Sequence, residues 1–313
     1  MLSERRQWLL VAAAGVAFGT VAGLAVAGSL AIPDGSGSVR ALALCAGSAV
    51  LGLAVLGSMV QNERRPAVSP DDVWRTIAAV GGLWLVLASI DLVRAAAATA
   101  GVPVTGLGVD RFVEYLTDSG AGRVDGGAWV CVLACTLVAA VAYRRSASWS
   151  TAPVLVAAGL ALIARPVTGH MAQQPLGSLL NAVHVLAAAI WFGVLLALAL
   201  TVRGRGAWAE LLPRYSQLAL WCVISLVVSG VVDGAVRLGS VSALLGTGYG
   251  RILLAKAVVL VALLLLARVW RRRWVPGAAS HRVSAEESLR NAVLEVCAMS
   301  VALGLAAALA TTG

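Results

Sequence analysis

Charged side chains are scarce in this sequence. Asp, Glu, Lys and Arg together make up 12% of the 313 residues, whereas hydrophobic residues make up 60%. A soluble domain carries charge on roughly a quarter of its residues, and its interior has no room for so much apolar surface. The composition therefore excludes an ordinary soluble domain and predicts a protein whose main partner is the lipid bilayer.

The sequence also lacks a disulfide framework and a nucleotide-binding loop. Its five cysteines all fall inside apolar segments, which is not the placement of an extracellular disulfide scaffold. No glycine-rich phosphate-binding motif is present. Any transport that the protein carries out would therefore be secondary or passive.

The net charge of +9 does not indicate a nucleic-acid partner. The arginines form short clusters between apolar runs, whereas a nucleic-acid-binding protein gathers its basic residues on one face. Clusters between apolar runs are typical of the loops of a membrane protein, where they set the orientation of the chain.

Nine apolar runs approach the roughly 20 residues that a helix needs to cross the hydrocarbon of a bilayer. Helices are expected because lipid offers the backbone no hydrogen-bond partners. The predicted fold class is all-α, a polytopic transmembrane helical bundle that forms a single membrane domain over residues 1–313. The predicted spans are Trp8–Ile32, Arg40–Val60, Val73–Ala98, Gly127–Tyr143, Ser150–Arg165, Ser178–Val202, Tyr215–Val236, Tyr249–Trp270 and Leu289–Thr311.

Arginine is distributed unequally between the two sets of loops. With the N-terminus inside, sixteen arginines lie in or beside the inward segments and seven on the outward side. This asymmetry predicts an N-terminus inside and a C-terminus outside. The first span has a second interpretation, because Arg5 and Arg6 followed by an apolar stretch and the Ala25-Val26-Ala27 sequence also fit a signal peptide. We favour a retained anchor; cleavage would leave eight spans in the same orientation.

The outward connection 99–126 is the longest loop between the predicted spans. Apolar residues fall at near-helical spacing in its segment Asp110–Leu116. Two interpretations remain open at this stage, a short helix at the outer membrane surface and an ordinary solvated loop.

Ionisable residues lie within the predicted spans, where each costs free energy unless it has a partner or a function. They are Asp91, Arg94, His184, Asp233, Lys256 and Glu295. Lys256 is the only lysine in the sequence. Asp91 and Asp233 lie at a comparable depth in the outer half, so the sequence favours a buried pair between Lys256 and one of these carboxylates; the alternative is that Lys256 extends to the outer surface. Glu295 lies about 9 Å from the inner end of its span, and either stays buried or turns toward the inner arginines.

Soft and nitrogen donors occur at the outer end of the sixth span. His184 lies about two turns into that span, and His170 and Met171 lie in the loop before it. Imidazole and thioether together suit copper, especially Cu(I), although a histidine within a span more often bonds a neighbouring helix. Cys131 and Cys135, at i and i+4 on the fourth span, form a second candidate ligand pair or simply pack in the core.

The second half of the chain, roughly residues 165–313, resembles the bacterial copper-resistance protein D (CopD/PcoD) family. The first half, 1–165, is less characteristic and matches in being helical. The resembling segments, in this order, are Thr168–His170, His184–Gly193, Tyr215–Ala219, Val228–Gly230, Thr247–Lys256 and Leu289–Glu295.

The resemblance implies a multi-pass protein of the bacterial cytoplasmic membrane that moves copper across the membrane or hands it on. It makes His170 and His184 the ligand candidates for a copper ion. Unlike some relatives, this sequence has no fused copper-binding domain and no Met-rich segment, so an extracytoplasmic copper carrier protein is an expected partner.

Two other functions compete with this hypothesis. A membrane haem protein with a redox function needs paired axial ligands on facing helices, and only His184 lies within a predicted span. A non-catalytic assembly factor for a copper-containing oxidase would use the polar residues only to orient its helices.

Overall fold

The computed structural model describes residues 2–30, 37–146, 148–168, 177–238 and 248–309. Within these ranges, the side chain of Lys256 and those of some residues near helix ends lie outside the description. The described residues form helices and no strand. The predicted fold class is therefore confirmed, and the protein is an all-α, polytopic membrane protein.

Each predicted span overlaps one helix. The helices are α1 (Leu2–Leu30), α2 (Gly37–Val60), α3 (Pro70–Thr99), α4 (Val109–Asp118), α5 (Gly120–Arg144), α6 (Ala152–Thr168), α7 (Gly177–Thr201), α8 (Arg205–Leu238), α10 (Gly248–Ala279) and α11 (Ala285–Leu309), with a 3₁₀ turn, η1, at Val104–Gly106. Seven of the described helices are long and apolar enough to cross a membrane, and α6 is a shorter apolar helix. The total of nine crossings remains a prediction.

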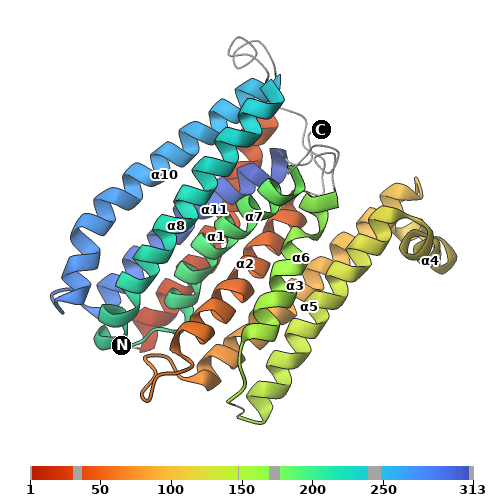
Figure 1. Ribbon diagram of the computed structural model, residues 1–313. Coiled ribbons are helices and arrows are strands. Elements are labelled where there is room, and N and C mark those ends of the chain that lie inside the picture. Colours follow the sequence, from red (N-terminus) through yellow and green to blue (C-terminus); the bar gives the residue numbers. More distant parts are fainter. Residues whose placement is uncertain (1, 31–36, 147, 169–176, 239–247, 310–313) are drawn as a thin grey trace.

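Two helices form the centre of the bundle. Helix α7 contacts α2, α3, α6, α8 and α11, while α2 contacts α1, α3, α6, α7 and α11. Helices α3, α5 and α6 pack on one side of this centre, and α8, α10 and α11 with α1 pack on the other (Figure 1). The first helix and the last long helix therefore lie side by side.

Helix α1 begins at one end of the bundle, and α11 ends at the opposite end (Figure 1). We call the first end the N-side and the other the C-side. Hydrogen bonds and ion pairs join the short N-side connections: Arg5 donates to the carbonyl of Val202 (2.7 Å), Arg203 pairs with Asp72 (3.0 Å), and Arg214 pairs with Glu63. The predicted alternation of the loops agrees with this grouping, whereas the side of the membrane that each end faces stays a prediction.

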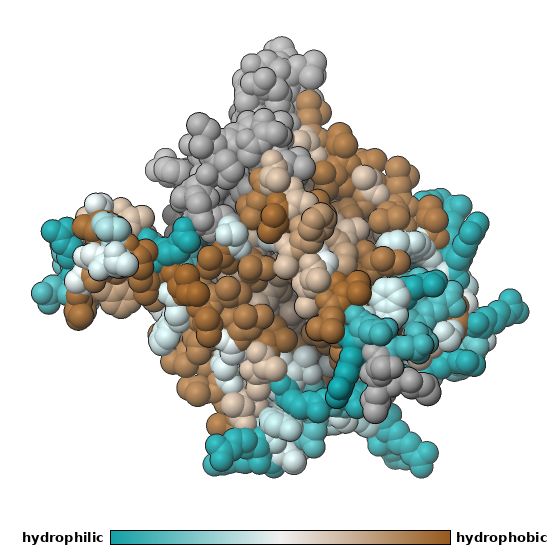
Figure 2. All heavy atoms as spheres, turned by 180° about the vertical axis from the view of Figure 1, so that it is seen from behind, coloured by the Kyte–Doolittle hydropathy of each residue, from teal (hydrophilic) through white to brown (hydrophobic). Residues whose placement is uncertain are grey.

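Apolar side chains cover the outside of the bundle between its two ends. Figure 2 shows them across the middle of the rear face, with polar side chains gathered at the N-side and on α4. Large apolar side chains exposed on the outer helices include Leu83, Val86 and Ile90 of α3, Val130 and Leu137 of α5, and Val258, Val261, Leu265 and Val269 of α10. Such a belt is what a lipid-facing surface requires.

Glycines allow the two central helices to touch. A Cβ atom added to Gly193 of α7 would lie 1.8 Å from the Ser48 carbonyl oxygen, and one added to Gly52 of α2 would lie 2.0 Å from the Gly193 carbonyl carbon. No side chain fits between backbones this close, so small residues fix this crossing, as is usual between helices in membranes.

The α1–α11 contact is built in the same way. A Cβ atom at Gly19 would meet the Ser300 hydroxyl at 2.2 Å, and one at Gly304 would meet the Thr20 carbonyl oxygen at 2.4 Å. The Thr20 side chain is buried, and its hydroxyl donates to the Val16 carbonyl of its own helix at 2.6 Å.

Several helices are longer than the predicted spans, and the start of α5 is the boundary that matters most for the ion pairs described below. Helix α5 begins at Gly120 rather than Gly127, because the Ser119 hydroxyl caps it by accepting a hydrogen bond from the Gly122 amide (2.8 Å). Asp125 therefore belongs to a helix and not to the loop. The segment Asp110–Leu116 lies within α4, which decides between the two interpretations in favour of a short helix.

Candidate functional site

His184 projects from α7 toward α8 in the C-side half of the bundle. Its Nδ1 lies 2.9 Å from the hydroxyl oxygen of Ser229, which is buried on α8. Helix packing is close here, because a Cβ atom added to Gly230 would lie 3.7 Å from Cε1 of the imidazole. The histidine is half-buried, so its ring is held between two helices near one end of the bundle.

The hydrogen bonds of Ser229 assign the tautomer of His184. The Ser229 hydroxyl has one hydrogen, and the oxygen lies 2.6 Å from the Ser225 carbonyl one turn earlier, which can only accept. Ser229 therefore donates to Ser225 and accepts from Nδ1–H of His184. In a neutral imidazole the lone pair then resides on Nε2, which is the form in which histidine ligates a metal.

Asp233, a predicted partner of Lys256, lies on the helix that faces His184. Asp233 lies at i+4 from Ser229 on α8, hence on the same face one turn nearer the C-side. His170 and Met171 lie outside the described residues, and so does the Lys256 side chain. The predicted pairing of Lys256 with Asp233 and the ligand set His170, Met171 and His184 therefore remain predictions.

A network of ionised side chains joins α2, α3, α5 and α6. The Arg165 guanidinium bonds both carboxylate oxygens of Asp125, at 2.5 and 2.6 Å, and one oxygen of Asp91, at 2.5 Å. Arg40 approaches the same Asp91 oxygen at 3.9 Å, and the Tyr115 hydroxyl donates to Asp125 at 2.7 Å. Two carboxylates thus face two guanidinium groups, so the charges of the network balance.

Arg165 is thus a partner of Asp91, while the side chain of Lys256 lies outside the described residues. The sequence assigns Arg165 to the end of a span, where an arginine normally extends into water. Its side chain is instead only one-third exposed and turns back between α3 and α5. An arginine can satisfy both carboxylates at once because its planar fork presents several donors, which an ammonium group cannot do in a fixed geometry.

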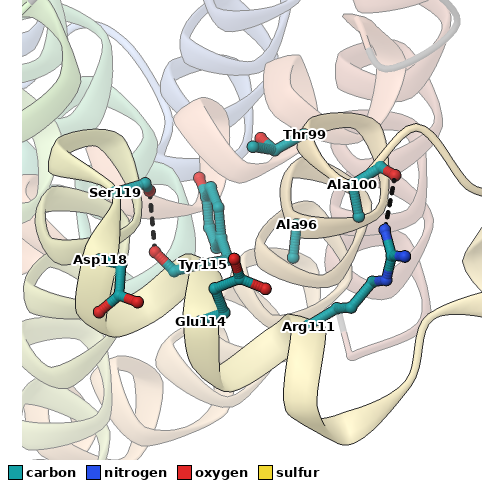
Figure 3. Close-up of a pocket in the computed structure, with 8 residues that line it drawn as sticks. All are labelled: Ala96, Thr99, Ala100, Arg111, Glu114, Tyr115, Asp118 and Ser119. Atoms are coloured by element: carbon teal, nitrogen blue, oxygen red, sulfur yellow. Dashed lines mark hydrogen bonds between the residues drawn. The ribbon is translucent and has the colours of Figure 1, made fainter.

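Tyr115 connects this network to the surface helix α4. Burial raises the pKa of the Tyr115 phenol above its usual range, and its hydrogen bond to Asp125 adds to this effect. The tyrosine ring also forms one wall of an open hollow of about 390 Å³ between α4 and the end of α3. Figure 3 shows Glu114 and Arg111 beside it, with Arg111 directed at the Ala100 carbonyl.

Glu295 lies in the N-side half, on α11. The carboxylate is buried, and its Oε1 lies 3.6 Å from Nη2 of Arg271 on α10. This contact agrees with the expectation that Glu295 turns toward the inner arginines, but the carboxylate remains buried. Arg271 also donates to the Ser216 carbonyl (3.2 Å), and its guanidinium lies 5.3 Å from the centre of the Tyr215 ring.

The two cysteines of α5 are separated by one turn, as their spacing predicts. Cys135 is buried, and its thiol lies 3.6 Å from the Val154 carbonyl of α6, while Cys131 is half-buried. Among the residues that the structure describes, no group of three or more His, Cys, Asp or Glu side chains could hold a metal ion. A thiol site at Cys131 and Cys135 thus stays a prediction.

The protein is thus a multi-pass helical membrane protein. It has a histidine held between two helices near one end and ion pairs buried in both halves. Profiles of two protein families match its sequence: "Copper resistance protein D-like, N-terminal domain" over residues 34–177 and "Copper resistance protein D" over residues 209–309. The chain belongs to the copper resistance protein D family. The likeness includes the first half, which the sequence motifs alone describe as less characteristic.

A curated relative extends this comparison. The chain is 30% identical over 174 residues to the copper transport protein CutJ of Bacillus subtilis (strain 168), an alignment that covers 52% of this chain and 32% of that protein. The chain thus spans about a third of the length of the relative that it matches. No solved structure matches the chain.

Proposed function

We propose that this protein moves copper across the bacterial cytoplasmic membrane or hands it on, and that copper enters at the C-side through Nε2 of His184. Family membership and the likeness to a copper transport protein support copper as the substrate. The observation that carries the site is the hydrogen bond from His184 to Ser229, because it leaves the lone pair on the nitrogen that a metal would take.

The remaining ligands of this site are proposed to be His170 and Met171. The loop that contains them connects α6 to α7, and the two helices are tied together there, since the Asn181 side chain donates to the Pro166 carbonyl at 2.9 Å. Imidazole and thioether donors favour Cu(I) over harder ions. Asp233, one turn from Ser229, supplies negative charge near the entrance.

The predicted orientation makes the C-side extracytoplasmic. Copper would then come from a separate carrier protein outside the membrane, for which the hollow beside α4 is one candidate surface at the C-side. With no nucleotide-binding loop in the sequence, movement through the bundle would follow the ion gradient or a coupled ion, and the protein would not act as an enzyme.

Copper accumulation in cells tests this function. Cells that produce the wild-type protein or His184→Ala at equal protein level are grown in added copper, and total cell copper is measured by mass spectrometry. We expect the wild type to change cell copper relative to cells without the protein, and His184→Ala to abolish that change. His281→Asn is the matched control, because His281 is exposed in the α10–α11 connection and its positive φ is one that asparagine tolerates. Equal copper contents in wild-type and His184→Ala cells would overturn the proposal.

A further inference from the structure

The contact between Glu295 and Arg271 is an incomplete ion pair. At 3.6 Å the charges attract, yet within the described part of the chain neither Glu295 oxygen has a hydrogen-bond partner, and Nε and Nη2 of Arg271 have none either. A buried carboxylate normally compensates its lost hydration with several hydrogen bonds. This one is buried without them.

Stability does not account for such a pair. The desolvation of two charges exceeds what a loose contact returns, and replacing buried pairs by apolar side chains often leaves stability unchanged or raises it. An ionised group kept inside a membrane bundle at this cost is by default part of an ion or substrate path. The pair therefore calls for a functional explanation.

The two partners differ in their freedom to move. The Glu295 side chain is 4% exposed and the Arg271 side chain 19% exposed. Arg271 lies in the N-side part of α10, next to the exposed residues Arg272 and Arg273. Its long side chain can therefore turn out into the arginine-rich N-side surface, whereas the carboxylate stays in place. Arg271 is the partner that an incoming cation would displace.

A soft donor lies one turn from the carboxylate. Met299 follows Glu295 by four residues on α11 and is buried, which places both side chains on one face. A thioether is a donor that Cu(I) prefers.

We propose that Glu295, with Met299, forms a second copper site in the N-side half of the bundle, specific for Cu(I), and that Arg271 is its built-in counter-cation. The proposal rests on the copper function above. The exchange is balanced in charge, because Cu⁺ and the guanidinium each carry one positive charge, so that the buried carboxylate is never left without a partner. Cu²⁺ would add a charge to the same space. His184 and Glu295 then mark the two ends of a path between α7, α8 and α11.

Cu(I) titration of the purified full-length protein under anaerobic conditions, against a chromophoric Cu(I) chelator, tests the second site. We expect the wild type to bind two Cu(I) ions, Glu295→Gln and His184→Ala to bind one each, and the double variant to bind none. If Glu295→Gln binds as the wild type does while His184→Ala loses one ion, the second site is refuted and the copper function stands. If the wild type binds no Cu(I), both proposals fail.

A variant that binds Cu(I) more tightly provides a second test, because a misfolded protein would not gain affinity. Arg271→Met removes the competing cation, and the affinity of one of the two sites should rise at least about tenfold. Arg271→Lys retains a positive charge and should stay close to the wild type. Arg272→Met is the matched control, since Arg272 is exposed on the same helix. An unchanged affinity in Arg271→Met would overturn the role of Arg271.

Discussion

Ser229 is the residue on which the His184 site depends most directly after the histidine itself. Ser229→Ala removes the acceptor of Nδ1–H, so the ring can rotate or change tautomer. We expect the affinity of the His184 site for Cu(I) to fall roughly 10- to 100-fold, the usual effect of losing such a partner, and Ser229→Thr to restore most of it. Chelator competition measures this affinity. Ser225→Ala is the control, because its exposed hydroxyl bonds only its own helix; an equal loss in both variants would contradict the assignment.

Arg165 should be the most stability-sensitive arginine outside the N-side. Arg165→Met leaves Asp91 and Asp125 buried without their main counter-charge, which costs on the order of 3 kcal/mol in the free energy of unfolding. Unfolding of the detergent-solubilised protein by SDS measures this cost. Arg123→Met, at an exposed C-side position of α5, should change it by less than about 0.5 kcal/mol. Equal stability of the two variants would show that the network contributes nothing.

At this scale the sequence predicts which residues are unusual but not what they touch. It singles out Asp91, Glu295 and His184, because an ionisable residue in an apolar run is visible without a structure. It does not reveal that Ser229 bonds His184, since a serine on a helix is ordinary, or that Arg165 is paired within the bundle, since an arginine at the end of a span normally faces water. The hydrogen-bond and ion-pair partners of these residues lie on helices that are distant in the sequence. A single sequence does not show which of these helices are in contact.

At the scale of elements, the α2–α7 crossing is the most sensitive contact. Gly193→Ala places a methyl group against the Ser48 carbonyl, and the two helices have to move apart. We expect a loss of about 1–3 kcal/mol in the free energy of unfolding, measured by SDS unfolding. Gly82→Ala is the matched control, because nothing lies within 4 Å of a Cβ atom there, and it should be neutral or slightly stabilising.

Helices and their order are predictable here because an apolar run of the right length has few alternatives in lipid. Ends are less so. Helix α5 begins seven residues before its apolar run. Its serine cap and polar first turn have the composition of a loop, so hydropathy alone does not assign them to a helix. Because of this boundary, the sequence does not predict that Asp125 lies in a helix, and therefore does not predict its ion pair with Arg165.

For the whole molecule, the arginine distribution predicts that the C-side is extracytoplasmic. Thr105→Cys, exposed in η1 at the C-side, should react with a membrane-impermeant maleimide on intact cells. Asn62→Cys, exposed in the α2–α3 connection at the N-side, should react only after the membrane is opened by detergent. The wild type, whose described cysteines lie within the helices, gives the background. Reversed labelling would invert the orientation and, with it, the direction of the proposed path.

The pairing of α1 with α11 has a consequence for how this protein is made. The ribosome completes α1 long before α11, so the first helix waits in the bilayer while some 250 further residues are inserted. Its buried hydroxyl, Thr20, does not wait unpaired, because it bonds the Val16 carbonyl within the same helix. The glycines that later receive α11 expose only backbone and add no polar side chain to lipid. Helix α1 is thus built to persist alone during synthesis and to close the bundle as its last step.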